Sequence, residues 1–270
     1  MKARALLLAA AIATAITACA TTTSPTGRRQ VVGAVSEAQL AELGAKAFDE
    51  AKAKTPQSRD SRQTTYVRCV VTSIVRQLPP DWQRLGWDMA LFENPEANAF
   101  ALPGGKVGVY TGIFKVARNQ DQLAGVIAHE IGHVVSHHHD ERITRQMGTQ
   151  TGLGIVGALL GSRYGEGVGN TAQQIGSVAA QGLFLLPNSR EQESEADVVG
   201  QQLMAKAGYD PEGAVALWRN MAETGGSRPP QWLSTHPDPA SRLRELQQRA
   251  DGLRPTMLAA RAAGNTPRCQ

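Results

Sequence analysis

The residues with the clearest chemical potential lie in the stretch His129-Glu130-Ile131-Gly132-His133, an HExxH pattern. Two histidines four positions apart lie on one face of an α-helix, so both imidazoles can reach a single zinc ion. Glu130 is close enough to hold a zinc-bound water. Zinc lowers the pKa of that water to roughly 7, and a carboxylate can take its proton as it attacks a carbonyl. The pattern therefore predicts a zinc-dependent hydrolase, provided that the chain supplies a third ligand and a substrate cleft.

The third ligand is expected in residues 189–197 (SREQESEAD), where a further helix begins. Glu193 and Asp197 share one helical face at i and i+4. One of these two carboxylates can bind zinc while the other accepts the free N–H of a ligand histidine and fixes its tautomer. Charged runs usually form solvated faces, and Glu191 and Glu195 are interpreted as such residues.

The HExxH helix is predicted to begin after Asn119, which has Gln122 three residues on as a capping partner. Its buried face is formed by apolar residues on both sides of the motif, namely Leu123, Val126, Ile127, Val134 and Val135. Three ligands at i, i+4 and i+8 cannot easily converge on one ion. Residues 137–139, which are all histidines, are therefore interpreted as a solvated helix end.

Ahead of this helix the hydrophobic period changes to two. Residues 87–92 alternate as in a half-buried strand, and residues 98–102 and 106–110 are predicted as two further strands joined by the turn 103–105. In zinc endopeptidases with this order of elements, an edge strand beside the metal lets an extended substrate add as one more strand. The candidate substrate-binding residues are Asn98, Ala99, Phe100 and Ala101. The alternative is a plain hairpin without a ligand.

The remaining segments are interpreted as scaffold. Helices are predicted over 36–54, 62–78 and 211–221, with a last helix that carries Arg242. The Gly- and Ala-rich segment 147–186 is too short and too interrupted by charges to span a membrane, and is predicted to form a loop or short helices over the active site.

The N-terminus predicts export. Residues 1–18 combine the basic Lys2 and Arg4 with an apolar run, and Ile16-Thr17-Ala18-Cys19 resembles the lipobox of bacterial lipoproteins. The resemblance predicts lipidation of Cys19 and, because Ala20 follows it, the outer membrane. The alternative is an ordinary secretory signal with a chance cysteine.

The net charge of the chain is less informative than its cysteines. Without Lys2 and Arg4 the chain has 26 basic against 24 acidic side chains, a balance of about +2 that gives no indication of nucleic-acid binding. Setting Cys19 aside leaves Cys69 and Cys269, which we expect to form a disulfide in an oxidising periplasm. The alternative is one buried and one exposed thiol.

Four ordered motifs together resemble the CaaX-prenyl-protease-like zinc endopeptidases, and in particular their bacterial outer-membrane lipoprotein branch of the LoiP and BepA kind. They are HEIGH, ExEAD at 193–197, NAFALPGG from Asn98 and STHPDPASR from Ser234. The resemblance implies one zinc ion held by His129, His133 and Glu193, as in gluzincins. It implies Glu130 as general base and Asp197 behind a ligand histidine. It also places His236 and Arg242 near the metal, where His236 would stabilise the oxyanion or regulate access.

The sequence thus predicts a mainly helical α+β zincin (gluzincin) fold with a small sheet beside the HExxH helix. The predicted organisation is a signal peptide at 1–18, a lipidated tether at 19–35, the peptidase domain at 36–250 and a C-terminal tail at 251–270. The predicted function is endopeptidase cleavage of unfolded or misassembled envelope proteins. The predicted partners are polypeptide substrates, the outer membrane through the lipid anchor, and envelope assembly machinery. Two alternatives are a chaperone or assembly factor whose proteolysis is latent because His236 occupies the water position, and a purely structural zinc site.

Overall fold

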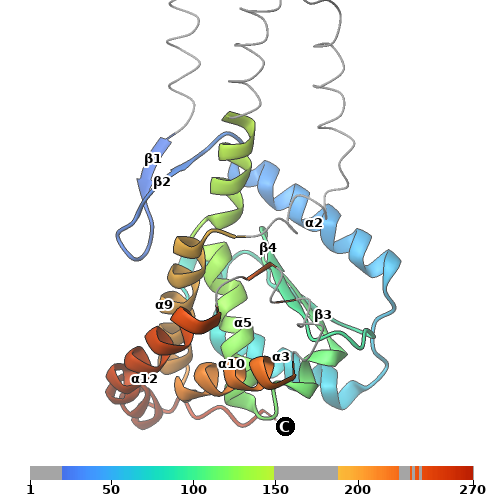
Figure 1. Cartoon of the computed structure of the whole chain (residues 1–270). Coiled ribbons are helices and arrows are strands. Elements are labelled where there is room, and N and C mark those ends of the chain that lie inside the picture. Colours follow the sequence, from blue (N-terminus) through green and yellow to red (C-terminus); the bar gives the residue numbers. More distant parts are fainter. Residues whose placement is uncertain (1–19, 149–187, 225–231, 233–234, 237–238, 270) are drawn as a thin grey trace, which may run out of the picture.

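A computed structural model describes residues 20–148, 188–224, 232, 235–236 and 239–269. Its elements follow the order β1 (Ala20–Thr23), β2 (Arg29–Val32), α2 (Glu37–Lys54), α3 (Ser61–Val75), α4 (Pro80–Gln83), β3 (Asp88–Phe92), β4 (Ala99–Leu102), β5 (Lys106–Tyr110), η1 (Thr111–Lys115), α5 (Gln120–Val135), α9 (Arg190–Lys206), α10 (Glu212–Thr224) and α12 (Pro239–Ala262). Another helical stretch covers 138–148. The predicted signal peptide, Cys19 and residues 149–186 of the Gly-rich segment lie outside the described residues. The fold is mainly helical with small sheets (Figure 1).

Local sequence signals fix where the helices begin. Ser36 caps α2 and Ser189 caps α9, each in a reciprocal capping box with the glutamine three residues on. Asp60 accepts hydrogen bonds from two backbone N–H groups at the start of α3. The helix predicted over 62–78 is shorter in the structure, because α3 ends at Val75 and the short helix α4 follows with a proline in its first turn.

The predicted strands form one three-stranded sheet in the order β3-β5-β4. β4 and β5 form an antiparallel hairpin, whose turn contains Gly104 and Gly105 at φ values of 76° and 73° that favour glycine. β3 pairs with β5 in parallel, so β5 is the central strand and β4 lies at an edge.

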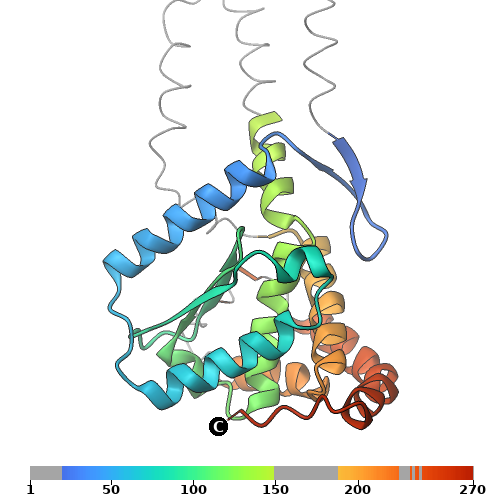
Figure 2. The same ribbon diagram turned by 180° about the vertical axis from the view of Figure 1, so that it is seen from behind.

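The sheet is covered on both faces. Met89 and Leu91 pack in a core with α3 and α5, whereas Ala90 and Phe92 pack against Phe48 of α2 and its neighbours. Figures 1 and 2 show the same arrangement, with α2 on one side of the sheet and α3 on the other. The expectation of a half-buried β3 is therefore wrong, because an alternating pattern does not reveal that α2 covers the second face.

α5 is the central helix of the molecule. It contacts α3, α9, α10 and β4, while α12 packs on α9 and α10. Every residue from Gln122 to Val135 is buried. Among the described helices, none has the length and apolar character needed to cross a membrane.

Both ends of the described chain are packed onto the domain. The segment predicted as a tether contains an antiparallel hairpin of β1 and β2, with Arg28 in its loop. At the other end, α12 continues without a break across the boundary expected at 250. Cys269 then forms a disulfide with Cys69 of α3, across 200 residues of sequence.

Candidate metal centre

α5 brings the two histidines of the HExxH pattern together. Asn119 caps the helix by accepting the N–H of Gln122 at 2.9 Å, as the sequence predicts. One turn apart on the same face, the Nε2 atoms of His129 and His133 lie 3.0 Å from each other. Both rings are buried, at 4% and 2% exposure, so the motif lies inside the protein.

Two glycines let α9 approach α5 closely. A Cβ atom on Gly132 would lie 2.9 Å from the carbonyl oxygen of Ala196, and one on Gly200 would lie 3.0 Å from the backbone nitrogen of His129. Because a side chain at either position would force the helices apart, these glycines set the distance at which α9 presents its acidic face to the histidines.

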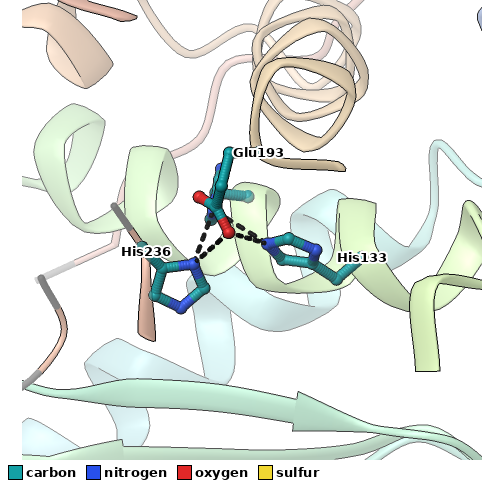
Figure 3. A group of neighbouring side chains, drawn as sticks. His133, Glu193 and His236 are labelled. Carbon is teal, nitrogen blue, oxygen red and sulfur yellow. Dashed lines mark hydrogen bonds and ion pairs between the residues drawn. The ribbon is translucent and has the colours of Figure 1, made fainter. Parts of the chain in front are cut away.

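The structure shows which of the two carboxylates, Glu193 or Asp197, faces both histidines, a choice that the sequence leaves open. Oε1 of Glu193 lies 3.4 Å from His133 Nε2 and 2.9 Å from Nδ1 of His236 (Figure 3). Oε2 of Glu193 lies 3.3 Å from His129 Nε2. One ligand atom from each of these four residues lies within 4.8 Å of the others. Asp197 instead lies behind His129, with its Oδ1 2.9 Å from Nδ1.

The donor chemistry of this cluster fits one zinc ion, which takes nitrogen and carboxylate ligands in a tetrahedral arrangement. The charge distribution also favours a cation there. Burial lowers the pKa of His129, but hydrogen bonds to Asp197 and Glu193 outweigh it and raise that pKa to about 9. Among the described residues, Oε2 of Glu193 is buried without a hydrogen-bond partner, although Arg242 Nη1 lies 2.6 Å away.

Asp197 and Arg242 orient His129. Nδ1–H of His129 donates to Asp197, which leaves Nε2 free to bind a metal. Arg242 donates to both oxygens of Asp197, each at 2.7 Å, and its guanidinium lies 4.2 Å above the ring of Trp218. Burial raises the pKa of Asp197, but Arg242 outweighs burial and holds it below its ordinary value.

Glu130 faces the cluster without belonging to it. Its Oε1 accepts a hydrogen bond from Trp232 Nε1 at 2.6 Å and lies 3.3 Å from Nε2 of His236. The carboxylate is 4% exposed. Sequence reasoning missed Trp232, because a tryptophan is not a metal ligand and the notable motifs lie elsewhere in the chain. It also missed Asn188, whose amide donates to Glu193 at 2.7 Å from the position just before the α9 cap.

The histidines after the motif are not a solvated helix end. His137 adopts a left-handed backbone at φ 55°, which ends α5 and redirects the chain into the helix of 138–148. His138 is fully buried and His139 is 7% exposed. The interpretation of Glu195 as a solvated acid is also wrong, because it is 3% exposed and contacts His138, whereas Glu191 is exposed.

The predicted substrate strand lies beside this site. β4 contacts α5 and has no strand on its other side among the described residues. Since Tyr110 N–H donates to the carbonyl of Asn98, the alternating ladder directs the backbone of Phe100 toward β5 as well. Ala99 and Ala101 therefore present their backbone groups to the open edge, where Nε2–H of His139 donates to the Ala101 carbonyl at 2.9 Å.

The site combines a buried pair of histidines on an HExxH helix with a glutamate from a second helix. A further carboxylate lies next to this ligand cluster without belonging to it. These features are those of a metallopeptidase domain. The model of Peptidase family M48 matches residues 61–250. The chain belongs to this family of zinc-dependent metalloendopeptidases.

Curated relatives fall into two groups of comparable similarity. The mitochondrial metalloendopeptidase OMA1 of Schizosaccharomyces pombe is 34% identical over 61% of this chain and 47% of its own. The beta-barrel assembly-enhancing protease of Escherichia coli is 33% identical over 62% of this chain and 35% of its own. The OMA1 metalloendopeptidase of Bos taurus is 32% identical over 84% of this chain and 44% of its own. The chain thus spans about a third to a half of these relatives, and the similarity does not single out the outer-membrane branch.

Proposed function

We propose that this protein is a zinc endopeptidase of the bacterial envelope that cleaves unfolded or misassembled proteins. The observation that carries the proposal is the position of Glu130, next to the ligand cluster and bonded by Trp232 rather than engaged as a ligand. A purely structural zinc site needs no such base. The beta-barrel assembly-enhancing protease supports the envelope setting and a link to assembly machinery, on the strength of its name.

The chain's residues divide the chemistry between them. His129, His133 and Glu193 would hold the zinc ion, which supplies Lewis acidity toward water and the scissile carbonyl. Glu130 accepts the proton of the attacking water on a carboxylate oxygen and later passes it to the leaving amine. His236 can donate a hydrogen bond to the tetrahedral oxyanion from Nε2, 3.3 Å from Glu130.

The substrate is proposed to bind as an extra strand on β4. The backbone groups of Ala99 and the N–H of Ala101 face the open edge, which is the side that an extended peptide would use. Main-chain hydrogen bonds do not depend on the side chains of the peptide. Binding as an added strand therefore suits a protease that acts on unfolded chains. His139 already occupies the Ala101 carbonyl, so the peptide would pair with only a short stretch of β4.

The proposed location is the outer membrane, facing the periplasm, with Cys19 lipidated after removal of residues 1–18 and a peptidase domain over 36–250. The lipobox-like sequence supports this placement.

The test uses the full chain in detergent. We expect it to degrade casein, to lose this activity to a chelator and to regain it with zinc, and to incorporate labelled palmitate in cells unless Cys19 is replaced by serine. A chain that binds zinc yet leaves casein intact would contradict the endopeptidase proposal, and palmitate-free protein would contradict the anchor.

A second candidate function is an assembly factor or chaperone with latent proteolysis. The observation that favours it is the position of His236, whose Nδ1 lies 2.9 Å from Glu193 and 3.3 Å from His129 Nε2, as a fourth protein ligand would. A water that must be activated would compete with this imidazole for the same position.

The variant His236→Ala separates the two roles of this histidine. If His236 closes the site, its removal is expected to raise the rate of casein hydrolysis several-fold and to weaken zinc binding, because one ligand is lost. If His236 only stabilises the oxyanion, hydrolysis falls by about 10²- to 10³-fold and zinc affinity stays the same. The oxyanion role given to His236 above predicts the fall, and a rise in rate together with weaker zinc binding would instead support latent proteolysis. The measurement is initial rate against zinc affinity for the same preparations.

A further inference from the structure

Nδ1 of His133, the ring nitrogen that faces away from the ligand cluster, has an unusual partner. Its Nδ1 lies 2.7 Å from Nδ1 of His138, five residues further along the chain. This spacing does not place two side chains on one face of a continuous helix. The left-handed residue His137 interrupts the helix between them and turns His138 back toward the site. His138 is fully buried, so this contact replaces water at the back of the ligand.

His138 in turn contacts Glu195 of α9. Its Nε2 lies 3.1 Å from Oε2 of Glu195, and a carboxylate can only accept. Nε2 therefore carries the proton of His138, its Nδ1 accepts from Nδ1–H of His133, and Nε2 of His133 keeps its lone pair for the metal. Each hydrogen bond in this series is donated in the direction away from the metal. His133 is therefore held in the tautomer with the proton on Nδ1, which ligation through Nε2 requires.

Arg28, from the loop of the N-terminal hairpin, is the last member of this series of hydrogen bonds. Its Nε donates to Glu195 Oε2 at 2.8 Å, and its two terminal nitrogens donate to the oxygens of Glu141, each at 2.8 Å. Thr26 of the same loop donates to Glu195 Oε1 at 2.6 Å. Both carboxylates are buried, at 3% and 2% exposure.

One guanidinium thus lies between two buried acids. Burial raises the pKa of Glu195, but His138, Thr26 and Arg28 together outweigh burial and hold that pKa well below its ordinary value. Gln192 donates to Glu141 and Arg145 pairs with it, whereas Arg28 contacts both Glu141 and Glu195. Without Arg28, Glu195 would lose the charge that keeps it fixed as the acceptor of His138.

The arrangement parallels the support of the other ligand histidine. His129 is oriented by Asp197, which Arg242 holds with two hydrogen bonds. His133 is oriented by His138, which Glu195 and Arg28 hold. The difference lies in the origin of the arginine, since residue 28 precedes the family match that begins at residue 61.

We propose that His138 and Arg28 are positioning residues for the zinc ligand His133, so that the N-terminal hairpin is an integral part of the metal site. The chain His133–His138–Glu195–Arg28 fixes the direction of one zinc ligand from outside the segment that carries the motif. This inference rests on the zinc ligands of the proposed function but not on its hydrolytic step.

The test measures zinc affinity of the full chain in detergent by competition with a chromogenic chelator. His138→Leu removes the acceptor for His133, and we expect zinc binding to weaken by about 10- to 100-fold. His138→Asn can place its carbonyl oxygen near the position of Nδ1, so it should restore part of this loss. Arg28→Ala should weaken binding about tenfold, whereas Arg29→Ala, which removes the same charge from the exposed neighbour, should change it less than twofold.

A double-variant comparison separates positioning from general stability. If Arg28 acts through His138, then Arg28→Ala in the His138→Asn background, where the link to Glu195 is already cut, changes zinc affinity less than twofold. Equal losses in both backgrounds, or a folded His138→Leu protein with unchanged zinc affinity, would overturn the proposal. Circular dichroism of each zinc-free variant confirms folding. Because no substrate enters the assay, failure here is distinct from failure of the peptidase proposal, for which Glu130→Gln with unchanged zinc affinity is the reference.

Discussion

Replacing Glu130 with glutamine is expected to lower casein hydrolysis by about 10²- to 10⁴-fold while zinc stays bound. The glutamate carboxylate can accept the proton of the attacking water, and a neutral amide cannot, so the loss corresponds to general-base catalysis. Zinc affinity should change little, because Glu130 is not in the four-residue ligand cluster. Glutamine also keeps a carbonyl oxygen that can accept the Trp232 hydrogen bond of 2.6 Å.

The measurement pairs initial rates with zinc content and affinity on the same preparations. Glu191→Gln is the matched control, since Glu191 is an exposed acid at the start of α9 and its replacement should leave both quantities unchanged. Hydrolysis within tenfold of the unmodified protein would show that another group, such as His236 at 3.3 Å from Glu130, accepts the proton. Loss of zinc together with activity would instead move Glu130 into the ligand set.

Local signals made the helices and strands predictable. The capping residues Ser36, Asn119 and Ser189 lie where polar side chains precede apolar periodicity, and the structure begins a helix at each. Likewise the turn at 103–105 fixed the β4–β5 hairpin. These features depend on residues within four positions of one another, so the sequence contains the information that determines them.

The assignment of the acids needed distances between elements. Glu193 and Asp197 share one face of α9, so periodicity cannot say which reaches the metal. The answer depends on the approach of α9 to α5, which Gly132 and Gly200 permit. The structure then gives Glu193 the contact with both Nε2 atoms and Asp197 the contact behind His129.

The contacts that orient His133 could not be predicted from the sequence, for two physical reasons. The helix break at His137 occurs without a glycine or proline, so the three histidines read as a continuous turn. Arg28 and Glu195 are 167 positions apart, and a polar segment rich in Thr, Ser and Gly gives no indication of a buried ion pair. Charged residues in such segments are usually solvated, and this expectation failed where the tertiary structure brought acids and arginine together.

Arg242→Ala is expected to destabilise the zinc-free protein by about 3–5 kcal/mol, because it removes the guanidinium that contacts two buried carboxylates, Asp197 and Glu193. Arg242 is 3% exposed and contacts Asp197 through Nε and Nη2 at 2.7 Å and Glu193 through Nη1 at 2.6 Å. Burial lowers the pKa of Arg242, but Asp197 and Glu193 outweigh burial and raise it, so the guanidinium stays charged. The loss should be smaller in the zinc-loaded protein, because the metal supplies positive charge next to Glu193.

The experiment compares the free energies of unfolding of the zinc-free and zinc-loaded full chain in urea. Arg244→Ala is the control, since Arg244 is exposed on the same helix α12 and its removal should change stability by no more than about 0.5 kcal/mol. Arg242→Lys keeps the charge without the planar fork that binds Asp197 at two points, so an intermediate loss is expected. A loss below about 1 kcal/mol in the zinc-free protein would mean that solvent or protonation neutralises the two acids. The same outcome would remove the argument that their charge makes the site select a cation.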